Sequence, residues 1–120
     1  MNQRKRRSSN GKTDEYRQII RDILTEYSQI KSANEEVEAE LIFDLERDRY
    51  QLVHVGWSRK RRIYGCILHL DIKDGKIWIQ HDGTEVGIAN ELIAKDIPKH
   101  DIIIGFHSPF KRQFTEFAVS

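Results

Sequence analysis

The chain contains two apolar runs joined by Asp74-Gly75, and their pattern predicts a β-hairpin. A type I′ turn needs positive φ at both central residues, and Asp-Gly is a common pair at these positions. With Asp74-Gly75 as a two-residue loop, Asp71 lies opposite Trp78 and Leu70 lies opposite Ile79. The turn therefore fixes the register of the hairpin, and the register assigns each side chain to one of two faces.

The two predicted faces of this hairpin differ in polarity. One is apolar and must be buried against another layer, and it carries Tyr64, Cys66, Leu68, Leu70, Ile72, Ile77 and Ile79. The other is mixed, and it carries Gly65, Ile67, His69, Asp71, Trp78 and Gln80. A mixed face is typical of a sheet that is only partly covered, or of a binding surface.

Two further patterns precede the hairpin. Apolar residues recur at the helical period from Tyr16 to Ile30, which predicts an amphipathic helix that begins near Thr13 or Asp14. Alternation then predicts strands at residues 37–44 and 50–57. Because these strands are close together in the sequence, an antiparallel meander is the simplest topology.

Shorter elements are predicted after the hairpin. A second helix follows Asp82-Gly83, with Asp82 and Glu85 as a capping box, and it ends before Pro98. The apolar run at residues 102–106 predicts a fifth strand. Pro109 favours a short C-terminal helix. The predicted fold class is therefore α+β: an N-terminal amphipathic helix on a mainly antiparallel sheet of about five strands, with a second helix before the last strand and a short C-terminal helix.

The length of the chain and the distribution of its charges predict where the folded domain begins. The 120 residues suit one domain, with 38% apolar and 32% charged residues. Residues 1–13 hold five cations and no acid, so we expect a disordered basic arm followed by a single domain at residues 14–120. The lone Cys66 excludes an internal disulfide, and no apolar run is long enough to span a membrane. A cytoplasmic location is expected.

Catalytic chemistry has little support in the sequence. The histidines match no zinc-binding spacing, and His69 and His81 fall on opposite faces in the register above. Asp71 and Lys73 resemble part of a metal-dependent nuclease site, with Asp44 as a second acid, but Lys is ordinary beside a turn. The sequence has no nucleophile elbow and no glycine-rich phosphate loop. No metal or cofactor is therefore predicted.

Two basic spots are candidate interaction sites. Four consecutive cations form one of them: Arg59, Lys60, Arg61 and Arg62. The other is Lys111 with Arg112, which lie in sequence among Phe110, Phe114 and Phe117. Cations beside aromatic residues suit phosphate binding and base stacking, and they equally suit a protein interface. Both interpretations stay open at this point.

Several segments of the chain form a distinctive set: E-R-D-R-Y-Q-L (46–52), R-I-Y-G-C (62–66), D-I-K-D-G-K-I-W-I-Q-H-D-G-T-E (71–85) and I-P-K-H-D-I (97–102). Together they resemble the XisI family, the controlling factors for excision of the fdxN element in filamentous cyanobacteria. The resemblance covers nearly all of residues 14–120. The long central motif is the most specific of these.

The resemblance implies a small α+β protein that is required for a developmentally regulated DNA rearrangement, such as occurs in heterocysts. It implies that a separate site-specific recombinase cuts the DNA and that an XisH-like protein is the partner. The family supplies no catalytic residue to transfer. We therefore expect a non-enzymatic accessory factor that acts by protein contacts, and direct DNA contact and a homo-oligomer both stay open. Two alternative functions also stay open: a metal-dependent nuclease and a stand-alone DNA-binding module. The candidate interaction surface comprises Arg59, Lys60, Arg61, Arg62, His69, Asp71, Trp78, Gln80, Lys111 and Arg112.

Overall fold

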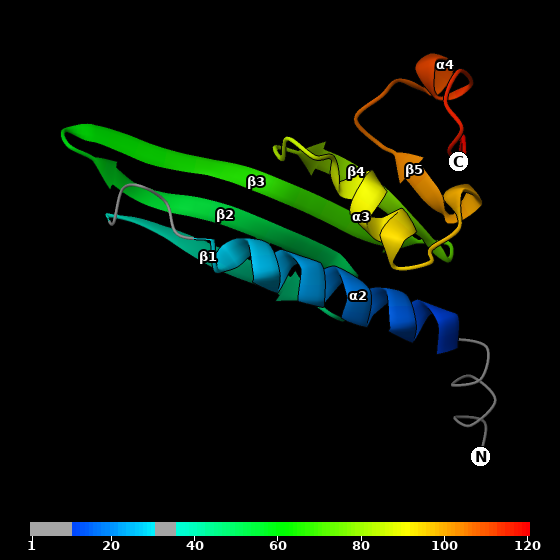
Figure 1. The fold of residues 1–120 in the computed structure, drawn as a ribbon, viewed down its shortest axis with the longest axis horizontal. Coiled ribbons are helices and arrows are strands. Elements are labelled where there is room, and N and C mark those ends of the chain that lie inside the picture. Colours follow the sequence, from blue (N-terminus) through cyan, green and yellow to red (C-terminus); the bar gives the residue numbers. More distant parts are fainter. Residues whose placement is uncertain (1–10, 31–35) are drawn as a thin grey trace.

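The computed structural model describes residues 11–30 and 36–120. Its elements are α2 (Gly11–Ser28), β1 (Val37–Asp44), β2 (Arg49–Ser58), β3 (Arg61–Lys73), β4 (Lys76–Asp82), α3 (Ile88–Ala94), the 3-10 turn η1 (Lys99–Asp101), β5 (Ile102–Ile104) and α4 (Pro109–Arg112). The strands form one sheet in the order β1-β2-β3-β4-β5, antiparallel except for the parallel pair β4–β5 (Figure 1). The predicted α+β architecture is confirmed.

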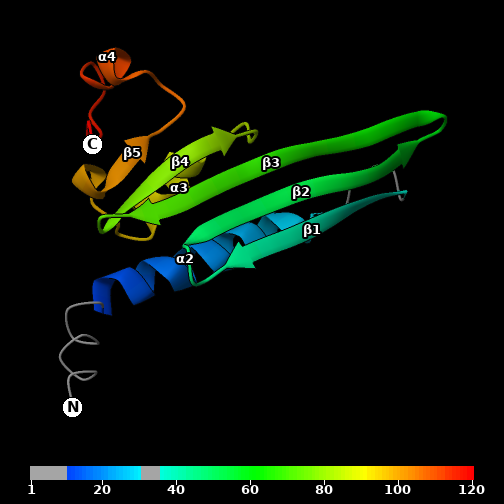
Figure 2. The same cartoon turned by 180° about the vertical axis from the view of Figure 1, so that it is seen from behind.

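The protein has two layers. Helices α2 and α3 lie on one face of the sheet, and the strands are in front of both helices when the molecule is seen from behind (Figure 2). The buried core between the layers includes Tyr16, Ile20, Ile23, Leu24, Tyr50, Leu52, Leu68, Leu70, Ile72, Ile77, Ile79, Ile88 and Leu92. We call this side of the sheet the covered face and the other side the open face.

The hairpin between β3 and β4 has the predicted register. Asp71 pairs with Trp78, and Leu70 pairs with Ile79. Asp74 and Gly75 have φ values of 54° and 75°, as a two-residue turn of this kind requires. The Asp74-Gly75 signal was therefore sufficient to set the register of β3 and β4 from the turn as far as the Leu70–Ile79 pair.

A bulge in β3 overturns the predicted faces at the other end of this strand. Leu52 pairs with Leu68 but Val53 pairs with Cys66, so Ile67 is an extra residue. Ile67 packs against the core, and Cys66 and Tyr64 are displaced to the open face. The prediction that Tyr64 and Cys66 share the buried face with Leu68 is wrong, because one inserted residue reverses the alternation. Tyr64 is 73% exposed.

A second bulge lies in β4. His69 pairs with His81 but Leu70 pairs with Ile79, so Gln80 is the extra residue. The prediction that His69 and His81 lie on opposite faces is therefore wrong, because the bulge makes them cross-strand partners. Asp82 follows on the covered face, where its Oδ2 accepts the amide of Ile88 at 2.8 Å and so caps the start of α3. This bond replaces the predicted capping box with Glu85.

Helix α2 begins earlier than predicted. It starts at Gly11, so the last three residues of the expected arm are helical, and residues 1–10 lie outside the described part of the chain. The predicted apolar stripe is correct as far as Tyr27, but Ile30 lies beyond the helix and is 66% exposed. Among the described residues, no helix is long and apolar enough to cross a lipid bilayer.

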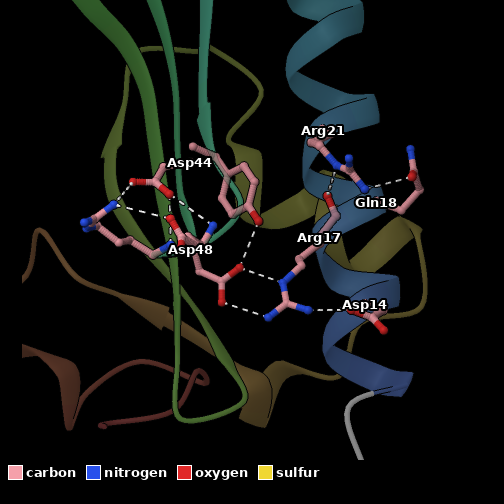
Figure 3. Close-up of polar contacts among 9 residues, drawn as sticks. Asp14, Arg17, Gln18, Arg21, Asp44 and Asp48 are labelled. Atoms are coloured by element: carbon pink, nitrogen blue, oxygen red, sulfur yellow. Dashed lines mark hydrogen bonds and ion pairs between the residues drawn. The ribbon is translucent and has the colours of Figure 1, made fainter. Parts of the chain in front are cut away.

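A polar clamp holds α2 against the sheet at the β1–β2 turn (Figure 3). The guanidinium of Arg17 donates from Nε to Asp48 Oδ1 at 2.7 Å and from Nη2 to Oδ2 at 3.0 Å. The hydroxyl of Tyr50 also donates to Asp48, at 2.9 Å. Because a bidentate pair fixes both distance and angle, the clamp sets where the helix lies on the covered face.

Candidate functional site: the open face of the sheet

The predicted interaction residues occupy two separate places on the molecule. His69, Asp71, Trp78 and Gln80 lie together on the open face of β3 and β4, as the hairpin register predicted. Arg112 of α4 reaches this group and Lys111 is exposed beside it, whereas Arg59–Arg62 form the distant tip of the β2–β3 hairpin (Figure 1).

Asp71 is the centre of the polar group and is only 8% exposed. Its carboxylate contacts His69 Nε2 at 2.9 Å and accepts from Gln80 Nε2 at 3.1 Å. The guanidinium of Arg49, on the neighbouring strand, lies 3.8 Å away. Both carboxylate oxygens therefore have partners, as a buried acid requires, and little of Asp71 is left for a ligand to contact.

Two cations lie close to the indole ring of Trp78. Lys73 Nζ is 4.4 Å from the centroid of its indole ring, and Arg112 Cζ is 5.1 Å from it. Arg112 also donates from Nη2 to the carbonyl of Gly105 at 3.3 Å, while its buried Nε has no partner among the described atoms. These contacts tie α4, which lies beyond the β5 edge of the sheet, to the open face of β4 (Figure 1).

Exposed phenylalanines surround α4. Phe106 is 53% exposed, Phe110 is 68% exposed and Phe114 is 74% exposed. The rings of Phe110 and Phe114 contact each other edge to face, with centroids 5.3 Å apart. Phe117, in contrast, packs against the core. Of the aromatic residues near Lys111 and Arg112, Phe117 therefore anchors the segment to the core. The remaining three phenylalanines stay on the surface.

The β2–β3 tip is the second place. Its two-residue turn contains Arg59, with φ 60°, and Lys60. Next to the turn, Arg62 Cζ lies 5.5 Å from the ring centroid of Trp57, its cross-strand partner. Trp57 is 48% exposed and shares the open face with Tyr64. The tip therefore combines cations with aromatic rings.

The residues of the nuclease alternative are used in other contacts. Asp44 accepts the amides of Glu46 and Arg47 at 3.0 Å each, which lowers the pKa of its carboxyl, and Lys73 lies over Trp78. No group of three or more His, Cys, Asp or Glu side chains in residues 11–30 and 36–120 is arranged to hold a metal. Burial raises the pKa of the Cys66 thiol, which disfavours the nucleophilic thiolate.

No pattern in the sequence indicates the two bulges, so the sequence could not show that Tyr64 joins Trp57 or that His81 faces His69. Nor does any pattern indicate the contact of Arg112 with Trp78, because a loop of irregular structure separates β5 from α4. The exposed Phe106, near the predicted end of the last strand, was likewise not selected as a surface residue.

Fold and site together define a small two-layer α+β protein with one sheet face left largely open for contacts. A family profile described as "XisI protein" matches residues 11–119. The chain belongs to the XisI family, and the resemblance noted from its motifs is confirmed.

Solved structures agree with this assignment. A XisI-like protein from Anabaena variabilis ATCC 29413 is 42% identical, with a TM-score of 0.84 and coverage of 88% of this chain and 97% of that chain. The fdxN element excision controlling factor XisI from the same organism is 41% identical, with a TM-score of 0.78 and coverage of 91% and 99%. No curated protein matches the chain.

Proposed function

We propose that this protein is a regulatory accessory factor for the site-specific excision of a DNA element, and that a separate recombinase cuts the DNA. The observation that carries the proposal is the 41% identity, over 91% of the chain, to the fdxN element excision controlling factor XisI. Near-complete coverage of both chains at this identity favours a shared role as well as a shared fold.

The open face supports a role in binding rather than in catalysis. An acid–base or metal site needs a carboxylate with free oxygens that substrate can reach. Asp71, the most central acid on this face, is 8% exposed and is bonded by His69 and Gln80. In this proposal the protein acts by binding other macromolecules. Its partner is an XisH-like protein, as the family resemblance implies.

The phenylalanines around α4 are the best surface for that partner. Contiguous exposed apolar groups on a soluble protein often mark protein interfaces, and aromatic residues and Arg are enriched there. Phe110 and Phe114 already contact each other, and Lys111 and Arg112 lie in the same segment. A partner that covers both rings would remove the largest aromatic exposures at this end of the molecule.

Co-purification tests this surface. The chain is co-expressed with a tagged XisH-like protein, which is then recovered from the cells, and excision is measured in parallel with a reporter assay. We expect the Phe110→Ser/Phe114→Ser variant to reduce both co-purification and excision at least about tenfold, as loss of a hot-spot pair does. Val86→Ser is the control, because Val86 is 66% exposed and belongs to the connection between β4 and α3, not to the segment around α4.

Two outcomes would contradict the proposal. One is unchanged excision in cells that lack this protein. The other is Mg²⁺-dependent plasmid cleavage by the purified chain that is lost in Asp71→Ala, since this would make the protein an enzyme.

A further inference from the structure

The tip of the β2–β3 hairpin, residues 57–62, extends beyond the rest of the sheet. Strand β1 begins at Val37, opposite Gly56, and the amide of Trp57 donates to the carbonyl of Glu36 at 3.3 Å. Within residues 11–30 and 36–120, no third strand pairs with the rest of the tip, residues 58–62. No residue from 54 to 65 belongs to the hydrophobic core cluster, and the tip lies far from both helices in the two views (Figures 1 and 2). The tip therefore projects as a two-stranded ribbon.

The charge of this ribbon is of one sign. Residues 49–70 include Arg49 and the tip cations Arg59–Arg62 but no Asp or Glu. The four tip cations are exposed, and none forms an ion pair with another described residue. Four adjacent cations repel one another, and an external polyanion would relieve this repulsion.

The acidic residues of β1 restrict how a polyanion can approach. Glu38 pairs with Val55 and Glu40 pairs with Val53, so both carboxylates are on the open face beside the base of the ribbon. A nucleic acid that lay across the sheet would meet these carboxylates. An approach to the end of the ribbon avoids them and reaches Arg59–Arg62 directly.

From this geometry we infer that the β2–β3 tip binds double-stranded DNA by entering a groove end-on. The major groove, about 12 Å wide, admits a two-stranded β-ribbon. Arg guanidinium groups bind phosphate and guanine edges bidentately, and the exposed Tyr64 and Trp57 can contact sugar and base next to them. The inference rests on the proposed function, because it makes DNA a direct ligand of the accessory factor.

A protein partner fits the tip less well. Charged residues as a group are depleted in the cores of protein interfaces, although Arg is enriched there. The tip presents four consecutive cations, which match the continuous charge of a phosphate backbone, whereas the exposed side chains around α4 are mainly phenylalanines. The two surfaces therefore suit two different classes of partner.

The test uses the purified full chain and a fluorescently labelled 20-base-pair duplex of arbitrary sequence, with anisotropy measured over a range of salt concentrations. The variant is Arg59→Gln/Lys60→Gln/Arg61→Gln, which leaves Arg62 over Trp57. The matched control is Arg4→Gln/Lys5→Gln/Arg6→Gln, which removes the same three residue types from the N-terminal arm. Thermal melting of each variant verifies that it is folded.

We expect the tip variant to lose roughly tenfold to 100-fold in affinity at 0.1 M salt. Its slope of log affinity against log salt should fall by about 0.9 for each phosphate contact removed. The arm variant should lose less than about threefold, since the arm is not part of the ribbon. Tyr64→Ala should weaken binding without changing this slope, which a purely electrostatic attachment would not produce.

Equal losses in the tip and arm variants would overturn the inference, because net charge alone would then explain the binding. So would the absence of DNA binding by the wild type, or binding lost only in the arm variant. If the wild type binds no DNA but excision still requires it, the inference fails and the proposed function stands. If DNA binds through the tip but excision does not need the protein, the proposed function fails instead.

Discussion

The two faces of the sheet do different work although the same strands build both. On the covered face Leu70 is fully buried, and it packs in the cluster that joins α2 and α3 to the strands. On the open face the next residue, Asp71, is held by polar partners, and aromatic and cationic side chains surround it. Stability is therefore concentrated on one face, and the capacity to bind partners is on the other.

The largest effect that can test this division is a cavity in the covered face. Leu70→Ala should lower the free energy of unfolding by about 3 kcal/mol, because it removes buried apolar contacts and leaves a void. Urea denaturation followed by circular dichroism measures the change.

The neighbouring residue on the open face is the matched control for that cavity. Asp71→Asn keeps the size and one acceptor oxygen for Gln80, so it should cost less than about 1.5 kcal/mol. If Asp71→Asn destabilises the protein as much as Leu70→Ala does, the open face carries as much of the stability as the core, and the division is wrong.

A smaller effect is expected at Gly56, where the covered face continues past the helices. A Cβ at this position would lie 2.1 Å from the carbonyl oxygen of Glu36, so Gly56→Ala must displace the backbone that leads into β1. We expect a loss of about 2 kcal/mol. The same substitution at Gly65, whose Cβ would meet nothing within 4 Å, is the control and should cost less than about 0.5 kcal/mol. Equal melting temperatures for the two variants would contradict this close packing.

The smallest effect concerns the buried acid at the end of the core. Burial acts to raise the pKa of Asp101, but the bonds donated by Lys12 at 2.6 Å and Tyr16 at 2.5 Å outweigh it, and the pKa is lowered from its ordinary 3.8. A lowered folded pKa contributes stability above pH 3.8, and this contribution is lost as the pH falls through the folded value.

Lys12→Met should therefore reduce stability by about 0.5 kcal/mol at neutral pH, because Lys12 is largely exposed. The difference from the wild type should shrink as the pH falls and vanish below the lowered pKa of Asp101 in the folded wild type, where the carboxyl is protonated in both proteins. Thermal melts from pH 2.5 to pH 7 measure it, with Lys95→Met as the control at an exposed site. A constant difference across this range would mean that Lys12 acts by packing and not through Asp101.

Much of the candidate site could be predicted from the sequence, because the register of the Asp74-Gly75 hairpin already placed His69, Asp71, Trp78 and Gln80 on one face. Of the four tip cations, only Arg59 and Lys60 lie in the turn, and Arg61 and Arg62 begin β3. The position of Arg112 over Trp78 could not be predicted, since it depends on the path of the irregular chain between β5 and α4. The exposure of Phe114 and the burial of Phe117 depend on the same path.

The sequence by itself determined the elements: the apolar stripe of α2, the span of β1 and the turn at Asp74-Gly75. These signals act between residues a few positions apart, so the pattern contains all that they need. Only the tertiary structure decided which side chains of β3 before Ile67 face outward. Ile67 is the extra residue of the bulge, and its carbonyl accepts a bond from the amide of Gly83, which lies in another segment. A contact between distant parts of the chain leaves no period in the sequence, and here it moves Tyr64 onto the open face of the sheet.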